Sequence, residues 1–208
     1  SLLTRLEEQV AFIQSRIESL RTSSDMKCYG FDISVAPFPS DDISLGKALE
    51  SLGVSALGLH GSLTAAAFLA DTLDRGNWHK TGFNGLMLPL LEDSRLAKRS
   101  VDGTLSVKDL LMFSAVCGTG LDTIPLAGNV STQQIYALLM DISALSARLR
   151  KPLTARLMPV PGKMAGELTS FQFSFFANGR ILELNAEPLG NLFAHPDEIL
   201  SIHPRHTH

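Results

Sequence analysis

Segments with strand periodicity alternate with segments with helix periodicity between residues 26 and 160, and this alternation is the strongest constraint on the fold. Residues 28–35 carry large apolar side chains at every second position, and 121–126 and 153–160 are apolar runs of strand length. Helical patterns lie between them, over 41–52, 63–75, 106–117 and 131–149. The last of these begins with the capping-box pattern Ser131-x-x-Gln134. Because a helix between two strands returns the chain to the same end of a sheet, the order predicts an α/β fold with largely parallel strands.

Two further segments complete the expected sheet. Residues 85–91 form an apolar run of strand length, although Pro89 marks it as an edge strand or a bulge. Near the C-terminus, 171–176 and 180–184 flank Asn178-Gly179, a dipeptide typical of a two-residue hairpin turn. The sequence therefore predicts a C-terminal β-hairpin after the parallel strands.

The chain divides into three expected parts. Residues 1–24 are predicted to form an amphipathic packing helix, residues 25–185 the α/β domain, and residues 186–208 a loosely held extension rich in Pro and His. The helix starts almost at the first residue, which indicates a fragment of a longer protein. Its apolar stripe consists of Leu3, Leu6, Val10, Ile13, Ile17 and Leu20.

Composition excludes several classes of partner. The 208 residues include 18 Lys and Arg against 21 Asp and Glu, without a basic run, so duplex nucleic acid and anionic membranes are poor partners. No apolar stretch reaches the length of a membrane span of about 18 residues. The two cysteines, Cys28 and Cys117, form no CxxC pair and favour a reducing compartment, so we expect a cytoplasmic protein.

Arg156 is the most informative single residue, because it lies within the apolar run 153–160 and is expected to be buried. A guanidinium in such a run must pair with a carboxylate, lie at the end of the strand, or hold an anionic ligand through two hydrogen bonds. A structural salt bridge, for example with Asp32, and an anion-binding role are both consistent with the sequence. Lys163 follows on a loop punctuated by Gly and Pro, which is typical of a binding loop but also of a plain turn.

Other polar residues follow or interrupt the expected strands. Asp32 and Ser34 share the polar face of the first strand, and His60 lies in a Gly-rich segment before a helix that Ser62 is expected to cap. That segment could also bind phosphate, but it matches no known phosphate-binding motif. Cys117 falls at the C-terminal end of a predicted helix, where the helix dipole disfavours a thiolate, so a buried inert thiol is favoured over a nucleophile.

The acidic residues that follow the strands are mostly expected to cap helices. Asp93 and Asp122 could together hold a divalent metal, although their spacing matches no known metal motif. The sequence identifies no cofactor and leaves a divalent metal open.

Four ordered segments resemble a known family: SVAPFP at 34–39, TGFNGLMLP at 81–89, SAVCGTGLDTIP at 114–125 and KPLTARLMPVPGK at 151–163. They are similar to an uncharacterised conserved family, the domain of unknown function numbered seven hundred and eleven. The resemblance covers residues 26–185 and corresponds to the C-terminal half of longer members.

The resemblance implies an α/β barrel, because the family is grouped with pyruvate formate-lyase-like proteins. Those enzymes carry a glycyl radical in an Arg-Val-x-Gly-Tyr type loop, and a central cysteine relays the radical. The C-terminal segment here has no such motif, so Cys117 at most corresponds to the relay cysteine. The family has no agreed activity to carry over.

Two hypotheses follow. The first is an enzyme that binds a small anionic metabolite at the barrel mouth, with Arg156, Lys163, Ser34 and Asn84 in binding roles and Cys117, Asp122, His60 and Asp32 as catalytic candidates. The second is a non-catalytic assembly module, in which the apolar stripe of residues 3–20 packs against a second copy of the chain or against the N-terminal half of the longer protein.

Overall fold

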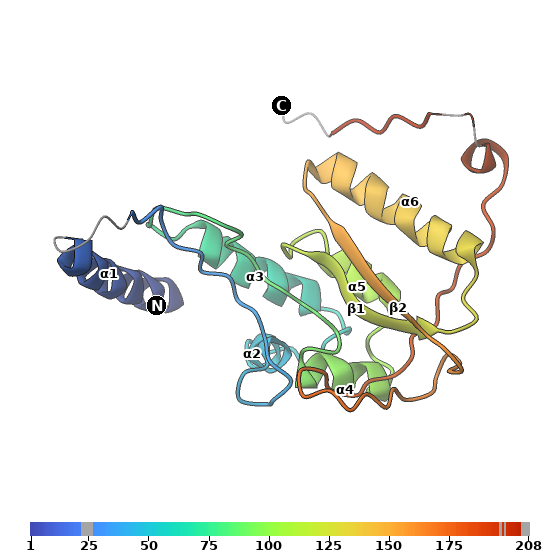
Figure 1. The fold of residues 1–208 in the computed structure, drawn as a ribbon, viewed down its shortest axis with the longest axis horizontal. Coiled ribbons are helices and arrows are strands. Elements are labelled where there is room, and N and C mark those ends of the chain that lie inside the picture. Colours follow the sequence, from blue (N-terminus) through green and yellow to red (C-terminus); the bar gives the residue numbers. More distant parts are fainter. Residues whose placement is uncertain (22–26, 196, 198, 205–208) are drawn as a thin grey trace.

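The computed structural model describes residues 1–21, 27–195, 197 and 199–204. It confirms the mixed α/β class, with helices arranged around a small parallel sheet (Figure 1). The elements are α1 (Leu2–Arg21), α2 (Leu45–Glu50), α3 (Ser62–Asp74), α4 (Ser94–Asp102), α5 (Val107–Phe113), β1 (Gly120–Ala127), α6 (Thr132–Leu149), β2 (Thr154–Val160) and the 3₁₀ helix η1 (Asn191–Ala194).

Strands β1 and β2 are parallel, with Gly120 opposite Thr154 and Ala127 opposite Val160. Two extended segments, 31–35 and 86–91, continue this arrangement on the other side of β1. The backbone N–H of Met87 donates to the carbonyl of Val35, and that of Leu90 donates to the carbonyl of Asp122, each at 3.0 Å. Segment 31–35 forms isolated bridges, between Phe31 and Lys80 and between Val35 and Leu86, and within segment 86–91 Pro89 has no N–H to donate.

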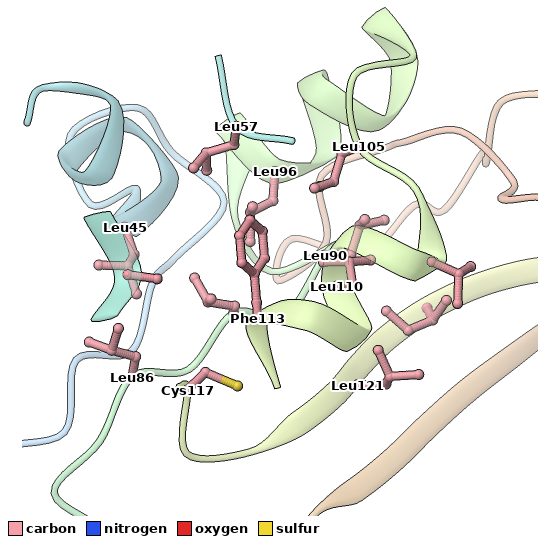
Figure 2. Close-up of a cluster of buried hydrophobic side chains, with 14 of the residues drawn as sticks. Leu45, Leu57, Leu86, Leu90, Leu96, Leu105, Leu110, Phe113, Cys117 and Leu121 are labelled. Carbon is pink, nitrogen blue, oxygen red and sulfur yellow. The ribbon is translucent and has the colours of Figure 1, made fainter. Parts of the chain in front are cut away.

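The hydrophobic core lies beneath segment 86–91, whose leucines contact α4, α5 and β1. Its leucine side chains at 86, 88, 90 and 91 are at most 2% exposed. Figure 2 shows Phe113 of α5 directed toward Leu96 of α4 and Leu57, with Leu90, Leu110 and Leu121 in the same cluster. An apolar run that was expected at an edge therefore lies at the centre of the molecule.

Asp93 joins α4 to α2 through a fully buried carboxylate. It accepts hydrogen bonds from the N–H groups of Arg95 and Leu96 at the start of α4, at 2.8 and 3.0 Å. It also accepts from the Ser44 hydroxyl at 2.7 Å and the Gly46 N–H at 2.9 Å. The predicted capping role of Asp93 is confirmed. Because this carboxylate accepts four hydrogen bonds from the protein, its role is to stabilise the protein interior.

The predicted C-terminal hairpin is wrong. The chain does run back on itself, since the N–H of Thr169 donates to the carbonyl of Gly179 at 2.9 Å and that of Ile181 donates to Glu167 at 2.8 Å. However, the reversal spans all of 170–178. The Asn178 side chain accepts from the Thr169 hydroxyl and from the Phe171 N–H, so it closes a wide loop where a two-residue turn was expected.

Only part of the apolar stripe of helix α1 is buried. Val10 is buried and Leu6 packs against the core, whereas Ile13 and Leu20 are 44% and 55% exposed. Ser1 caps the helix, because its hydroxyl accepts from the Thr4 N–H at 3.2 Å. Within the described ranges, no helix combines the length and apolar character needed to cross a membrane.

Helix α6 begins with the predicted capping box between Ser131 and Gln134. The C-terminal extension runs beside this helix in the described residues. The Tyr136 hydroxyl donates to the carbonyl of Phe193 at 2.9 Å, and Arg148 donates to the carbonyl of His203 at 2.6 Å. The rest of the expected extension, including 205–208, lies outside the described residues, as do residues 22–26 of the predicted N-terminal part.

Candidate functional site

The predicted site residues separate in space. Asp32, Ser34 and Asn84 form one group, Asp122 and Arg156 form a second, and Cys117 lines a cavity that Asn84 also lines. His60 is exposed in the turn before α3. Lys163 lies on the loop after β2, with its ammonium 3.9 Å from the Glu167 carboxylate.

The Asp32 carboxylate holds the loop 81–85 in place. It accepts from the backbone N–H groups of Phe83 and Asn84, each at 2.9 Å, and from the Ser34 hydroxyl. The hydrogen bond from Phe83 is the main cause that lowers the pKa of Asp32 to about 2, with Ser34 and Asn84 adding to it. Gly82 has a φ of +70°, and a Cβ there would lie 2.4 Å from an Asp32 oxygen, so the loop requires glycine at this position.

The Asn84 side chain adds further hydrogen bonds that hold this loop. Its Oδ1 accepts from the Ile33 N–H at 3.0 Å, and its Nδ2 donates to the Thr81 carbonyl at 2.6 Å. The side chains of Asp32, Ser34 and Asn84 therefore hold the polypeptide in position, and they shape a cavity wall through the backbone of residues 83–85.

The expected burial of Arg156 is wrong: its side chain is 50% exposed. In the described chain β2 pairs only with β1, so one edge and one face of β2 meet solvent. The guanidinium Nε lies 2.5 Å from Asp122 Oδ1, and an Nη lies 2.7 Å from Glu92 Oε1. The hydrogen bond that Arg156 donates to Asp122 is the main cause that raises the pKa of Arg156. The partners differ from the suggested Asp32, and two carboxylates already neutralise this cation.

Among the described residues, no cluster of His, Cys, Asp and Glu has a geometry that could hold a metal ion. Asp93 and Asp122, the suggested pair, have separate partners: Asp93 caps α4, and Asp122 pairs with Arg156.

A cavity of about 400 Å³ lies where three parallel segments begin. Leu86 opens segment 86–91, Gly118 precedes β1, and Lys151 precedes β2; all three line the cavity, and α3 contributes Asp71 and Asp74. Here it is called the Lys151 cavity. It lies at the amino-terminal ends of the strands, opposite to the carboxyl ends where sites in parallel sheets are usually expected.

Phe83 packs against the backbone that borders this cavity. A Cβ on Gly118 would lie 1.8 Å from the Phe83 ring, and one on Gly85 would lie 2.9 Å from it. The ring therefore rests on two glycines, which allow the loop 81–85 and the turn before β1 to approach each other closely. This contact connects the loop held by Asp32 to the turn that carries Cys117.

Lys151 is the half-buried cation of the cavity. Its ammonium donates to the carbonyl of Ser114 at 3.1 Å and to the carbonyl of Cys117. Removal from water lowers the pKa of Lys151, while the charge of Asp74 opposes that shift. In the described part of the chain no carboxylate lies within 4 Å of this ammonium, in contrast to Arg156 and Lys163.

The Cys117 thiol belongs to the core. The residue is 1% exposed, its sulfur lies 3.9 Å from the carbonyl oxygen of Gly120, and Figure 2 shows it in the buried cluster near Leu86. Helix α5 ends at Phe113, so Cys117 follows the helix by one turn of chain. Its expected burial is confirmed. The chemistry that the cavity offers is therefore ionic and hydrogen-bonding recognition by Lys151 and the α3 carboxylates.

The sequence did not single out Lys151 as a site residue. The signal that identifies it is its place in the segment 151–163, which resembles the family and also contains Arg156. No feature of the sequence identified Asp74 as a site residue, because the helical pattern around it does not indicate which loop its side chain faces.

Comparisons with known proteins agree with the resemblance. The family described as Uncharacterised ACR (DUF711) matches residues 2–178. Curated relatives include UPF0210 proteins of Syntrophobacter fumaroxidans, 36% identical over 67% of this chain, and of Pyrobaculum aerophilum, 36% identical over 65%. A UPF0210 protein of Oenococcus oeni is 33% identical over 67%. These matches cover 32%, 31% and 32% of the relatives, so the chain spans about a third of their length.

We predict that Asp32→Asn lowers the free energy of unfolding at neutral pH by about 1 kcal/mol, because an amide NH₂ replaces one oxygen that accepts an N–H. The pKa of Asp32 is lower in the folded protein than its ordinary value of 3.8. Its stabilising effect is therefore complete above that value and is lost as the pH falls toward 2. Urea unfolding at a series of pH values should show the wild type and the variant converging below pH 4.

The control is Asp42→Asn, which removes the same charge from an exposed loop residue. A constant difference between wild type and Asp32→Asn from pH 6 to pH 2 would contradict the assigned role of the carboxylate.

Proposed function

The chain belongs to the uncharacterised DUF711 family, and we propose that it forms part of an enzyme that binds a small metabolite with a carboxylate or similar anionic group in the Lys151 cavity. The observation that carries the proposal is the Lys151 ammonium, half-buried in the cavity wall and held by two uncharged carbonyl groups. A lysine ammonium has three N–H donors, so these carbonyls leave one donor and the positive charge for a ligand.

The carboxylates of α3 narrow the class of ligand that the Lys151 cavity can bind. Asp71 is paired with Arg75 at 2.8 Å, whereas Asp74 acts on Lys151 through its charge. A purely anionic ligand would be repelled by Asp74. A metabolite that presents a carboxylate to Lys151 and an amine or hydroxyl to Asp74, such as an α-amino acid, satisfies both groups.

The anion clamp expected from Arg156 and Lys163 has less support. Arg156 contacts Asp122 and Glu92, and Lys163 faces Glu167, so an incoming anion would have to displace or face these carboxylates. Neither residue lines the Lys151 cavity. The proposal therefore assigns recognition of the anion to Lys151, and the Asp32 carboxylate acts as a positioning group through the loop 81–85.

The expected barrel is part of this proposal. Segments 31–35 and 86–91 and strands β1 and β2 run parallel and adjacent to one another, as consecutive strands of a barrel wall would. In that arrangement the Lys151 cavity opens at the amino-terminal ends of the wall. The remaining strands would come from the rest of a full-length relative, of which this chain spans about a third.

We predict that Lys151→Met abolishes ligand-induced thermal stabilisation, because it keeps the apolar stem but removes the charge. The probes are a panel of α-amino acids and small dicarboxylates, measured by thermal shift. At 100 times its Kd, a ligand stabilises the wild type by about 2.7 kcal/mol, which corresponds to roughly 5 to 10 °C.

Lys163→Met is the matched control and should retain the shifts. Circular dichroism verifies that both variants fold. A shift that survives Lys151→Met and disappears in Lys163→Met would place the anion on the loop after β2, and the absence of any shift across the panel would contradict the proposal.

A second candidate function is assembly with another copy of the chain, supported by the exposed apolar side chains of α1. Ile13 and Leu20 belong to a stripe with the three- and four-residue spacing of helices that pair with one another. We predict that the wild type sediments as a dimer or larger species, and that Ile13→Glu combined with Leu20→Glu yields a monomer.

Leu149→Glu, at an exposed apolar position of α6, is the control and should leave the sedimentation unchanged. A monomeric wild type would contradict self-association. The apolar face of α1 would then be expected to pack against the rest of a longer relative.

A further inference from the structure

Arg180 lies against α4 and does not line the Lys151 cavity. Its backbone N–H donates to the buried Ser100 hydroxyl at 2.9 Å, and the residue forms an antiparallel bridge with Leu168. The preceding Gly179 is buried against α4, where a Cβ would lie 2.9 Å from the Ser100 oxygen. The start of the Arg180 side chain is thus fixed relative to α4.

The guanidinium of Arg180 has no carboxylate partner in the described part of the chain. Arg75, Arg95, Arg99 and Arg156 each lie within 4 Å of a carboxylate oxygen. Arg180 Nε is buried without a hydrogen-bond partner, as is Arg95 Nε, but Arg95 Nε lies 3.7 Å from a Glu50 oxygen. A guanidinium without an acceptor is unfavourable, so Arg180 lacks a partner for its charge.

A cavity of about 370 Å³ adjoins this side chain. It is bordered by the end of α4, the start of α5 and the returning segment 180–185. Gly103, the left-handed residue that ends α4, borders the guanidinium, and a Cβ there would lie 3.6 Å from Arg180 Nη1. Because glycine has no side chain, one side of the guanidinium is left open to the cavity.

We propose that this cavity is a second binding site, in which the guanidinium of Arg180 holds the oxyanion group of a small metabolite. The two parallel N–H groups of a guanidinium match the two oxygens of a carboxylate or a phosphate. This site is separate from the proposed function at Lys151 and does not depend on it.

The rim of the cavity adds a requirement for the rest of the ligand. Glu183 and Asn185 line the same cavity and are exposed, and no Glu183 oxygen lies within 4 Å of the Arg180 guanidinium. The Glu183 carboxylate weakens the binding of a bare anion, and it accepts hydrogen bonds from a hydroxyl or amine. The fitting class is a small phosphorylated or carboxylated metabolite that also carries hydroxyl or amine groups.

The test follows the Nε–H resonance of Arg180 by ¹H–¹⁵N NMR in the 208-residue chain, assigned by its loss in Arg180→Lys. Inorganic phosphate and malonate are titrated separately, with sodium chloride at matched ionic strength as the reference. We expect a saturable shift of the Arg180 resonance with at least one of the two anions. Arg156 Nε, which already donates to Asp122, serves as an internal control and should not follow the titration.

The titration can support the proposal or overturn it. A saturable response to phosphate alone, to malonate alone or to both supports the site and identifies the oxyanion. In Glu183→Gln the apparent Kd should fall roughly two- to five-fold, because an adjacent negative charge is removed. A response that equals that of chloride, or that Arg156 shares, overturns the proposal. Lys151→Met should leave the titration unchanged, so the two sites can fail independently.

Discussion

The Lys151 ammonium forms the interaction on which the candidate site depends. It lies immediately before β2 and donates to the carbonyls of Ser114 and Cys117, in the turn before β1. The Thr154 N–H adds a hydrogen bond to the Thr119 carbonyl at 2.8 Å between the same two segments. The ammonium thus holds the amino ends of two parallel strands together and supplies the positive charge of the cavity between them.

A second polar interaction builds the opposite wall. The Asp32 carboxylate accepts backbone N–H groups of the loop 81–85, and the Phe83 ring of that loop rests on Gly118. One wall is therefore organised by a carboxylate that binds N–H groups, and the other by an ammonium that binds carbonyl groups. Of these two groups, only the ammonium lines the cavity, and it is the group that we propose recognises an anionic ligand.

Much of the local structure could be predicted from the sequence. Residue periodicity identified β1, β2 and α6, and the pattern from Ser131 to Gln134 identified a capping box, because these features depend on neighbours in the chain. The exposure of Arg156 could not be predicted, since it depends on which strand forms the edge of the sheet. The wide loop closed by Asn178 also depends on a distant contact, because its ends pair through Thr169 and Gly179.

The site was harder to predict than the fold for the same reason. Cys117 and Asn84, which the sequence suggested as catalytic and binding candidates, line the cavity, but their side chains face inward, and the cation that lines it is Lys151. The most direct test is a ¹³C NMR pH titration of the Lys151 Cε resonance, assigned by its loss in Lys151→Met. Burial of the ammonium predicts a midpoint below the ordinary pKa of 10.5. A midpoint at or above that value would mean that the ammonium is solvated or already paired with a carboxylate, and would contradict the account.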